Sequence, residues 1–141
     1  MKIKYFALTA IILLTGKLYC ADIPHTPIGQ AIADSDLALV KKLIKSKQAS
    51  VKDSAYEDIF EPLLNVAIYT YGHIRNGENK TGDIDDAREI ITFLIDKGAP
   101  INIGSEQFGE KPLDAARGNN LPEIADLLIS KGAAKNLRSK L

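Results

Sequence analysis

Few residues in this chain have the type and spacing needed for catalysis. His25 and His73 stand in polar, loop-like segments with no evident catalytic partner. Residues 72–77, Gly-His-Ile-Arg-Asn-Gly, have the glycine spacing of a phosphate-binding loop, but Glu78 follows where that motif needs lysine, and its carboxylate would repel phosphate. The sequence contains no metal-ligand cluster and no nucleophile elbow. We therefore predict a protein that is not an enzyme and needs no cofactor or metal.

Three acidic residues, Asp83, Asp85 and Asp86, precede an apolar stretch. They lack the spacing of a calcium-binding loop. Because aspartate side chains accept hydrogen bonds from the free N–H groups at the start of a helix, we expect them to cap a helix.

The composition favours one globular domain that does not bind nucleic acid. The chain has 141 residues, with 18 basic and 18 acidic side chains, whereas a nucleic-acid-binding domain normally has a basic excess. Its 45% hydrophobic and 26% charged residues are ordinary for a globular protein.

The N-terminus, residues 1–21, has the three parts of a secretory signal peptide. A short basic start is followed by the apolar run of residues 5–14 and a more polar end. That run is about half of the ~20 residues needed to span a bilayer. We expect cleavage after Cys20 or Ala21 and export to the periplasm or the medium of a bacterium. The alternative is an uncleaved segment that anchors a structural protein at a membrane.

Lipidation of Cys20 is disfavoured by the residues before it. Tyr19 is bulky where a lipidation signal needs a small residue, and Lys17 replaces an aliphatic one. Cleavage after Ala21 would leave no cysteine, and therefore no disulfide.

The elements that must position any binding residue form an internal repeat. The clearest copy is residues 112–133, which reads as two short helices, a tight turn and a closing glycine. Residues 27–49 and 62–99 are variants of it, and the middle copy carries about 16 extra residues. Copies about 34 residues apart, each with two helices, are typical of helical solenoids.

Local signals mark where these helices begin and end. Thr26 can cap a helix that starts at Pro27. Gly98 and Gly132 end the second helices of two copies, because glycine adopts the left-handed closing conformation without strain. The first copy has Lys47 near that place, so we expect its end to fray.

The second helices also differ in how apolar they are. The first exposes lysines, the third is apolar on one face, and the middle one is apolar nearly all round. A central unit is covered on two sides, so this gradient predicts a stack of three units.

The chain resembles an ankyrin-repeat protein. The residues that carry the resemblance are Thr26-Pro27-Ile28, Pro62-Leu63, Val66-Ala67, Pro112-Leu113, Ala115-Ala116, Gly98-Ala99, Ile101-Asn102, Gly132-Ala133 and Asn136. The family's histidine is absent from every copy. The resemblance implies an all-α, ankyrin-type solenoid over residues 22–136, with repeats of about 24–52, 58–102 and 108–136. An insertion at about 69–85 interrupts the second repeat, and a tail, residues 137–141, follows.

The resemblance further implies a monomer that binds another protein through its hairpin-like loops and first helices, and that takes no nucleic acid or small-molecule substrate. The loops are residues 52–61, the first loop, and residues 103–111, the second loop. We expect contacts from apolar residues in exposed places and from the start of the insertion: Phe60, Ile68, Tyr69, Tyr71, His73, Arg75 and Phe108. Aromatic side chains are enriched at interface hot spots. Alternatively, Phe60 and Phe108 fold back over the edge of the stack.

The insertion leaves two interpretations open. Its first residues can extend a helix, and its glycine-rich middle predicts a loop. That loop either binds, for instance by occluding the active site of a partner enzyme, or is surface decoration.

Overall fold

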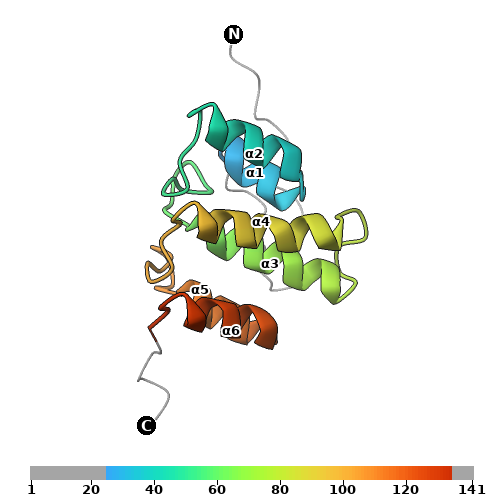
Figure 1. Cartoon of the computed structure of the whole chain (residues 1–141), viewed down its shortest axis with the longest axis vertical. Coiled ribbons are helices and arrows are strands. Elements are labelled where there is room, and N and C mark those ends of the chain that lie inside the picture. Colours follow the sequence, from blue (N-terminus) through green and yellow to red (C-terminus); the bar gives the residue numbers. More distant parts are fainter. Residues whose placement is uncertain (1–24, 135–141) are drawn as a thin grey trace, which may run out of the picture.

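The computed structural model describes residues 25–134, which form six helices and no strand (Figure 1). The predicted all-α fold class is confirmed. The helices are α1 (Pro27–Ala33), α2 (Leu37–Lys45), α3 (Leu63–Arg75), α4 (Ile84–Asp96), α5 (Pro112–Gly118) and α6 (Pro122–Ser130). The predicted signal segment 1–21, with Cys20, and the tail 137–141 lie outside the described residues. None of the described helices is long and apolar enough to span a bilayer.

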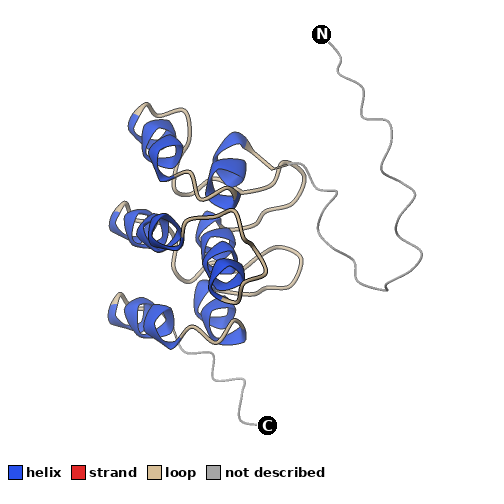
Figure 2. Ribbon diagram, turned by 90° about the vertical axis from the view of Figure 1, so that its right-hand side faces the viewer, coloured by secondary structure: helices blue, strands red, loops and turns tan. Residues whose placement is uncertain are grey.

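The helices form three pairs stacked along the long axis of the molecule. Each pair packs internally, as α1 with α2, α3 with α4 and α5 with α6. Helices α1, α3 and α5 lie in one layer, and α2, α4 and α6 lie in the other (Figures 1 and 2). The loops after α2 and α4 lie together at one end of the layers, on the left of Figure 1, whereas the α3–α4 loop lies at the opposite end.

Two helices, α1 and α4, begin at the predicted caps. The Thr26 hydroxyl accepts a hydrogen bond from the Gly29 N–H at 3.2 Å. The Asp83 carboxylate accepts from the N–H groups of Asp85 and Asp86 at 2.8 and 3.0 Å. The prediction that this acidic group caps a helix is confirmed. Such a cap stabilises a helix by about 1 kcal/mol.

All six described helices end in the same hydrogen-bonded turn. In each, a residue in the left-handed conformation follows the C-cap, and the next two N–H groups bond back to carbonyls of the last turn. Gly98 and Gly132, at φ 85° and 95°, hold this place after α4 and α6, as predicted. Lys47, at φ 58°, holds it after α2, where a side chain makes the conformation unfavourable.

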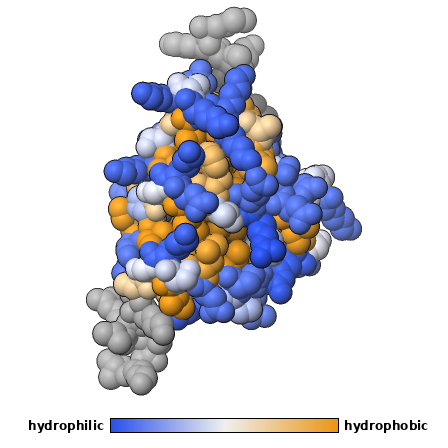
Figure 3. Space-filling view, viewed as in Figure 1, coloured by the Kyte–Doolittle hydropathy of each residue, from blue (hydrophilic) through white to orange (hydrophobic). Residues whose placement is uncertain are grey.

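The core is aliphatic and densest in the middle pair. Helix α3 contributes nine buried residues, whereas α2 contributes only Val40. Covering on two sides explains the difference, because α3 contacts both α1 and α5. The gradient predicted for the second helices is also present, with one buried residue in α2, five in α4 and three in α6. Patches of apolar surface remain between polar side chains on the α2, α4 and α6 face (Figure 3).

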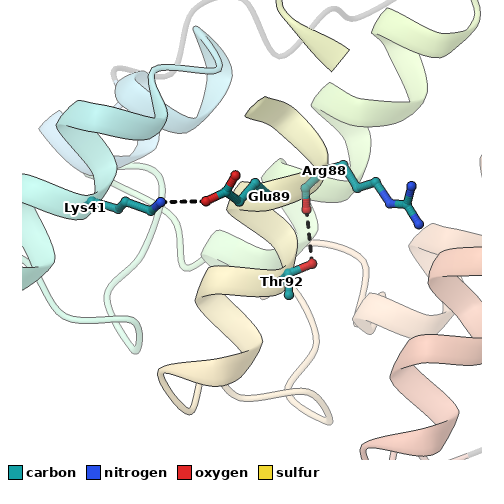
Figure 4. Close-up of polar contacts among 4 residues, drawn as sticks. All are labelled: Lys41, Arg88, Glu89 and Thr92. Atoms are coloured by element: carbon teal, nitrogen blue, oxygen red, sulfur yellow. Dashed lines mark hydrogen bonds and ion pairs between the residues drawn. The ribbon is translucent and has the colours of Figure 1, made fainter. Parts of the chain in front are cut away.

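A surface ion pair joins the first two pairs across that face. The Lys41 Nζ lies 2.6 Å from Oε1 of Glu89, so α2 is linked to α4 (Figure 4). The Arg88 side chain points away from this pair, and the Thr92 hydroxyl donates to the Arg88 carbonyl at 3.4 Å. Both charged partners are partly exposed, so the pair contributes about 0–1 kcal/mol.

About half of the predicted insertion, residues 69–85, is helical, because residues 69–75 belong to α3 and residues 84–85 to α4. Helix α3 runs to Arg75 and α4 starts at Ile84, so only residues 76–83 form the loop. Helix α3 has 13 residues against seven in α1 and α5, and α4 has 13 against nine in α2 and α6. The extra residues therefore lengthen the central pair rather than form one long loop.

Candidate partner-binding surface

The first and second loops are closed by their own hydrogen bonds. In the first loop the Ala55 N–H donates to the Glu61 carbonyl at 2.9 Å. In the second loop the Ser105 N–H donates to the Glu110 carbonyl at 2.9 Å, and Gly109 turns the chain at φ 64°. A side chain on Gly104 would place Cβ 2.5 Å from the Gly109 carbonyl oxygen, so the second loop needs glycine there.

Lateral hydrogen bonds connect the two loops to each other and to the start of the described chain. The Thr26 N–H donates to the Ala55 carbonyl at 3.0 Å. The Glu106 N–H donates to the Phe60 carbonyl, and the Phe60 N–H donates to Oε2 of Glu106, both at 2.9 Å. The loops are thus held side by side and present one surface, which we call the loop surface (residues 52–61 and 103–111).

A buried amide anchors the loop surface to α3. Asn65 is 0% exposed, and its Nδ2 donates to Oε1 of Glu61 and to the Glu110 carbonyl, both at 2.8 Å. The Tyr69 hydroxyl donates to the Glu110 carboxylate. The Oδ1 of Asn65 is buried and has no hydrogen-bond partner among the described residues. Asn65 and Tyr69 are four residues apart, which places them on one side of α3, and Glu61 lies two residues before that helix.

Burial raises the pKa values of two residues that anchor the loop surface, Glu61 and Tyr69. It raises the pKa of Glu61; the hydrogen bond from Asn65 opposes that shift, and the nearby Glu110 charge adds to it. Burial and the bond to Glu110 also raise the pKa of Tyr69, so its hydroxyl keeps its proton at neutral pH and donates it to the carboxylate.

The loop surface is acidic and partly apolar. Residues 53–61 contain four acidic side chains and no basic one, and residues 103–110 contain two acidic and none basic. Phe108 is 73% exposed and Ile103 is 48% exposed. Phe60 is half-buried. The surface thus combines negative charge with exposed apolar side chains.

Of the residues predicted to contact a partner, some are accessible at the loop surface and others are buried. Phe108 is exposed, and Phe60 and Tyr69 are half-buried at or beside the loop surface. The expectation that Ile68 is exposed is wrong: it is 0% exposed, because α3 is covered by α1 and α5. Tyr71 is also buried, at 7%.

Three predicted residues, Tyr71, His73 and Arg75, belong to a second group at the far end of α3. His73 contacts the Glu78 carboxylate. The Tyr71 hydroxyl and Nη1 of Arg75 both donate to Oε1 of Glu123, at 3.1 and 2.8 Å. Helix α3 rises about 18 Å from Leu63 to Arg75, so this group lies away from the loop surface.

Glu123 ties the end of α3 to the start of α6. Desolvation acts to raise its pKa, but its own main-chain N–H, Tyr71 and Arg75 hold the pKa of Glu123 below its ordinary value. The contacts join two helix pairs, which is a structural role.

The two loops predicted from the sequence include Glu61, Ile103 and Glu110 without singling them out, and sequence reasoning missed Asn65. The four-residue spacing of Glu61 and Asn65 was a local signal for their contact. The Asn65–Glu110 contact joins residues 45 positions apart, and no local pattern marks it. In the described part of the chain, no group of three or more His, Cys, Asp or Glu residues is placed to hold a metal ion.

No protein-family model matches this sequence. A search of curated proteins also finds no match. The fold and the surface therefore define the class of the protein only as all-α, with stacked helix pairs and an acidic loop surface.

Proposed function

We propose that this chain is an exported ankyrin-type module that binds another protein as a monomer and has no catalytic activity of its own. The structure supports the ankyrin assignment at several motif positions. Pro27 and Pro112 are the first residues of α1 and α5. Gly98 and Gly132 close α4 and α6 with positive φ. The loops that follow α2 and α4 lie side by side, as the loops of such repeats do.

The exposure of Phe108 carries the binding proposal. A phenylalanine at 73% exposure loses the benefit of burial unless another molecule covers it. Phe108 lies in the tight turn of the second loop, where its N–H donates to the Ser105 hydroxyl at 3.3 Å. The same loop is bonded to the Phe60 backbone through Glu106. The aromatic side chain is therefore held on an ordered turn.

Export is proposed from the N-terminal pattern of residues 1–21. The mass of the mature chain tests it. A start at Ala21 or Asp22 supports export with cleavage. Retention of Met1 together with sedimentation in the membrane fraction supports the anchored alternative instead.

The binding proposal is tested by crosslinking the full chain in its native extract and identifying what it captures. The variant Phe60→Ala/Tyr69→Ala/Phe108→Ala should lose the captured protein and keep its helical circular dichroism. The matched control, Leu39→Ala/Ile84→Ala, removes two exposed apolar residues of 37% and 41% exposure from other surfaces. The control should keep capture. Undiminished capture by the triple variant contradicts the proposal.

A further inference from the structure

We propose that the loop surface binds a basic segment of its partner, with a lysine or arginine of that segment seated against Glu61 and Glu110. This inference rests on the proposed function, because it names the chemistry of the protein that the module holds. It does not depend on the identity of that protein.

Charge complementarity is the first argument. The acidic residues of the loop surface are Asp53, Glu57, Asp58, Glu61, Glu106 and Glu110. Basic residues occur only at its ends, as Lys52 and Lys111. Like charges held in neighbouring loops repel one another, and a cationic partner relieves that repulsion. Nucleic acids and anionic lipid surfaces would be repelled.

The unpartnered acceptor of Asn65 is the second, independent argument. Its Nδ2 is fully used by Glu61 and by the Glu110 carbonyl, so the free atom is the oxygen. The neighbouring carboxylates cannot donate to it while they are ionised. A lysine ammonium has three N–H donors and arginine has five. Asn65 is 0% exposed, so a partner's cation would meet the carboxylates of Glu61 and Glu110 first and would reach the Asn65 oxygen only if these side chains move.

The aromatic and apolar side chains suit the stem of a basic residue. Lysine and arginine pack their alkyl stems on apolar surface while the charged end meets an acid. Phe108 and Ile103 offer that surface in the second loop. In the first loop the ring of Tyr56 packs on His25 with centroids 4.7 Å apart, so its position is fixed. Fixed aromatic rings also attract cations over their faces.

A second copy of this chain is the competing occupant. Helix α2 and the residue after its C-cap carry Lys41, Lys42, Lys45 and Lys47, and they lie in the layer opposite the first helices. These lysines on one molecule could meet the loop surface of another. Such an assembly would be concentration-dependent, so the molecular mass measured over a range of concentrations separates the two occupants.

The test uses an array of synthetic peptides of random sequence, probed with the labelled full chain. Bound peptides should be enriched in lysine and arginine. The best of them should bind Glu61→Gln/Glu110→Gln about tenfold more weakly at low salt, with a smaller salt dependence. These substitutions remove charge but keep an acceptor oxygen for Asn65 and for Tyr69. The control Asp96→Asn/Asp126→Asn removes the same charge from α4 and α6 and should bind like the natural chain.

Any one of three results with the peptide array overturns the inference: bound peptides without basic enrichment, no bound peptide, or equal weakening in the control. The inference is also overturned if the molecular mass in solution rises with protein concentration and this rise is smaller for Glu61→Gln/Glu110→Gln. That result would assign the loop surface to a second copy of the chain. If Phe60→Ala/Tyr69→Ala/Phe108→Ala loses the captured protein but Glu61→Gln/Glu110→Gln does not, the binding proposal stands and the basic partner is wrong. If neither variant changes capture, both fail.

Discussion

Asn65 offers the sharpest test of how the loop surface is held to α3. Replacing it with alanine removes a hydrogen bond to a carboxylate, Glu61, and one to the Glu110 carbonyl. The first contributes about 1.5–3 kcal/mol and the second about 0.5–1.5 kcal/mol. Removing the unpartnered Oδ1 should raise the free energy of unfolding by about 1–3 kcal/mol, because a buried acceptor without a donor is unfavourable. We therefore expect Asn65→Ala to lower the free energy of unfolding by about 1–2 kcal/mol.

Asn65→Asp should be worse than Asn65→Ala at neutral pH. The aspartate places a carboxylate where an NH₂ group now faces two acceptors, and it does so at a site that is 0% exposed. An unpaired charge there should lower the free energy of unfolding by about 3 kcal/mol or more. As the pH falls and the carboxylate gains a proton that it can donate, the difference between the two variants should shrink.

Urea unfolding followed by helical circular dichroism measures these differences. The control is Asn119→Ala, because the Asn119 amide donates only to Ala115 within its own helix, at 2.8 Å. Its loss should be below about 1 kcal/mol. Equal or greater stability of Asn65→Asp relative to Asn65→Ala at neutral pH would refute the assignment of Nδ2 as the donor to both acceptors.

Three further predictions concern stability and use the same unfolding measurement. Gly29→Ala should lower the free energy of unfolding by about 2 kcal/mol or more, because the new Cβ would lie 2.1 Å from the Ala55 carbonyl oxygen; Gly118→Ala, whose nearest atom lies at 3.9 Å, should be neutral or stabilising. Lys47→Gly should raise the free energy of unfolding by about 0.5–1 kcal/mol by relieving a side chain at φ 58°, whereas Lys42→Gly, inside α2, should lower it by a similar amount. The raised pKa of Glu61 favours its protonated form in the folded state, so its contribution to stability is present below the ordinary value of 4.5 and is lost as the pH rises through the folded pKa. Glu61→Gln should therefore be more stable than the natural chain at neutral pH and no more stable than it below pH 4.5. A variant that is less stable than the natural chain at neutral pH would show that burial does not raise the pKa of Glu61.

The helices were predictable because their signals are local. Proline, cap residues and closing glycines lie within a few positions of the helix ends that they determine, so Thr26, Asp83, Gly98 and Gly132 stand where the sequence placed them. Lys47 shows the limit of such reasoning. The closing turn forms at a lysine, because hydrogen bonds from residues 47 and 48 to Ile44 and Leu43 still determine the conformation.

The burial of Ile68 was not predictable from a local pattern. The sequence shows a run of apolar residues in α3, but not that α1 and α5 both cover this helix. Because α1 and α5 cover α3 on two sides, nearly every apolar residue of α3 is buried. The same long-range packing brings Glu110 to Asn65 and Tyr69.

Three departures from ordinary folding rules lie at or beside the loop surface, although others, such as the buried unpartnered hydroxyl of Ser35 and the positive φ of Lys47, lie elsewhere. Phe108 is exposed, Glu61 keeps a charge that burial opposes, and the Oδ1 of Asn65 lacks a donor. Each costs stability, and substitutions as small as Glu61→Gln are expected to remove part of that cost. Natural sequences break such rules mainly where function requires it. A partner with a basic side chain would resolve the first two directly, by covering the ring and pairing the charge, and would bring donors close to the buried oxygen. The coincidence of the three at one surface is therefore a stronger reason to locate binding there than any one of the residues alone.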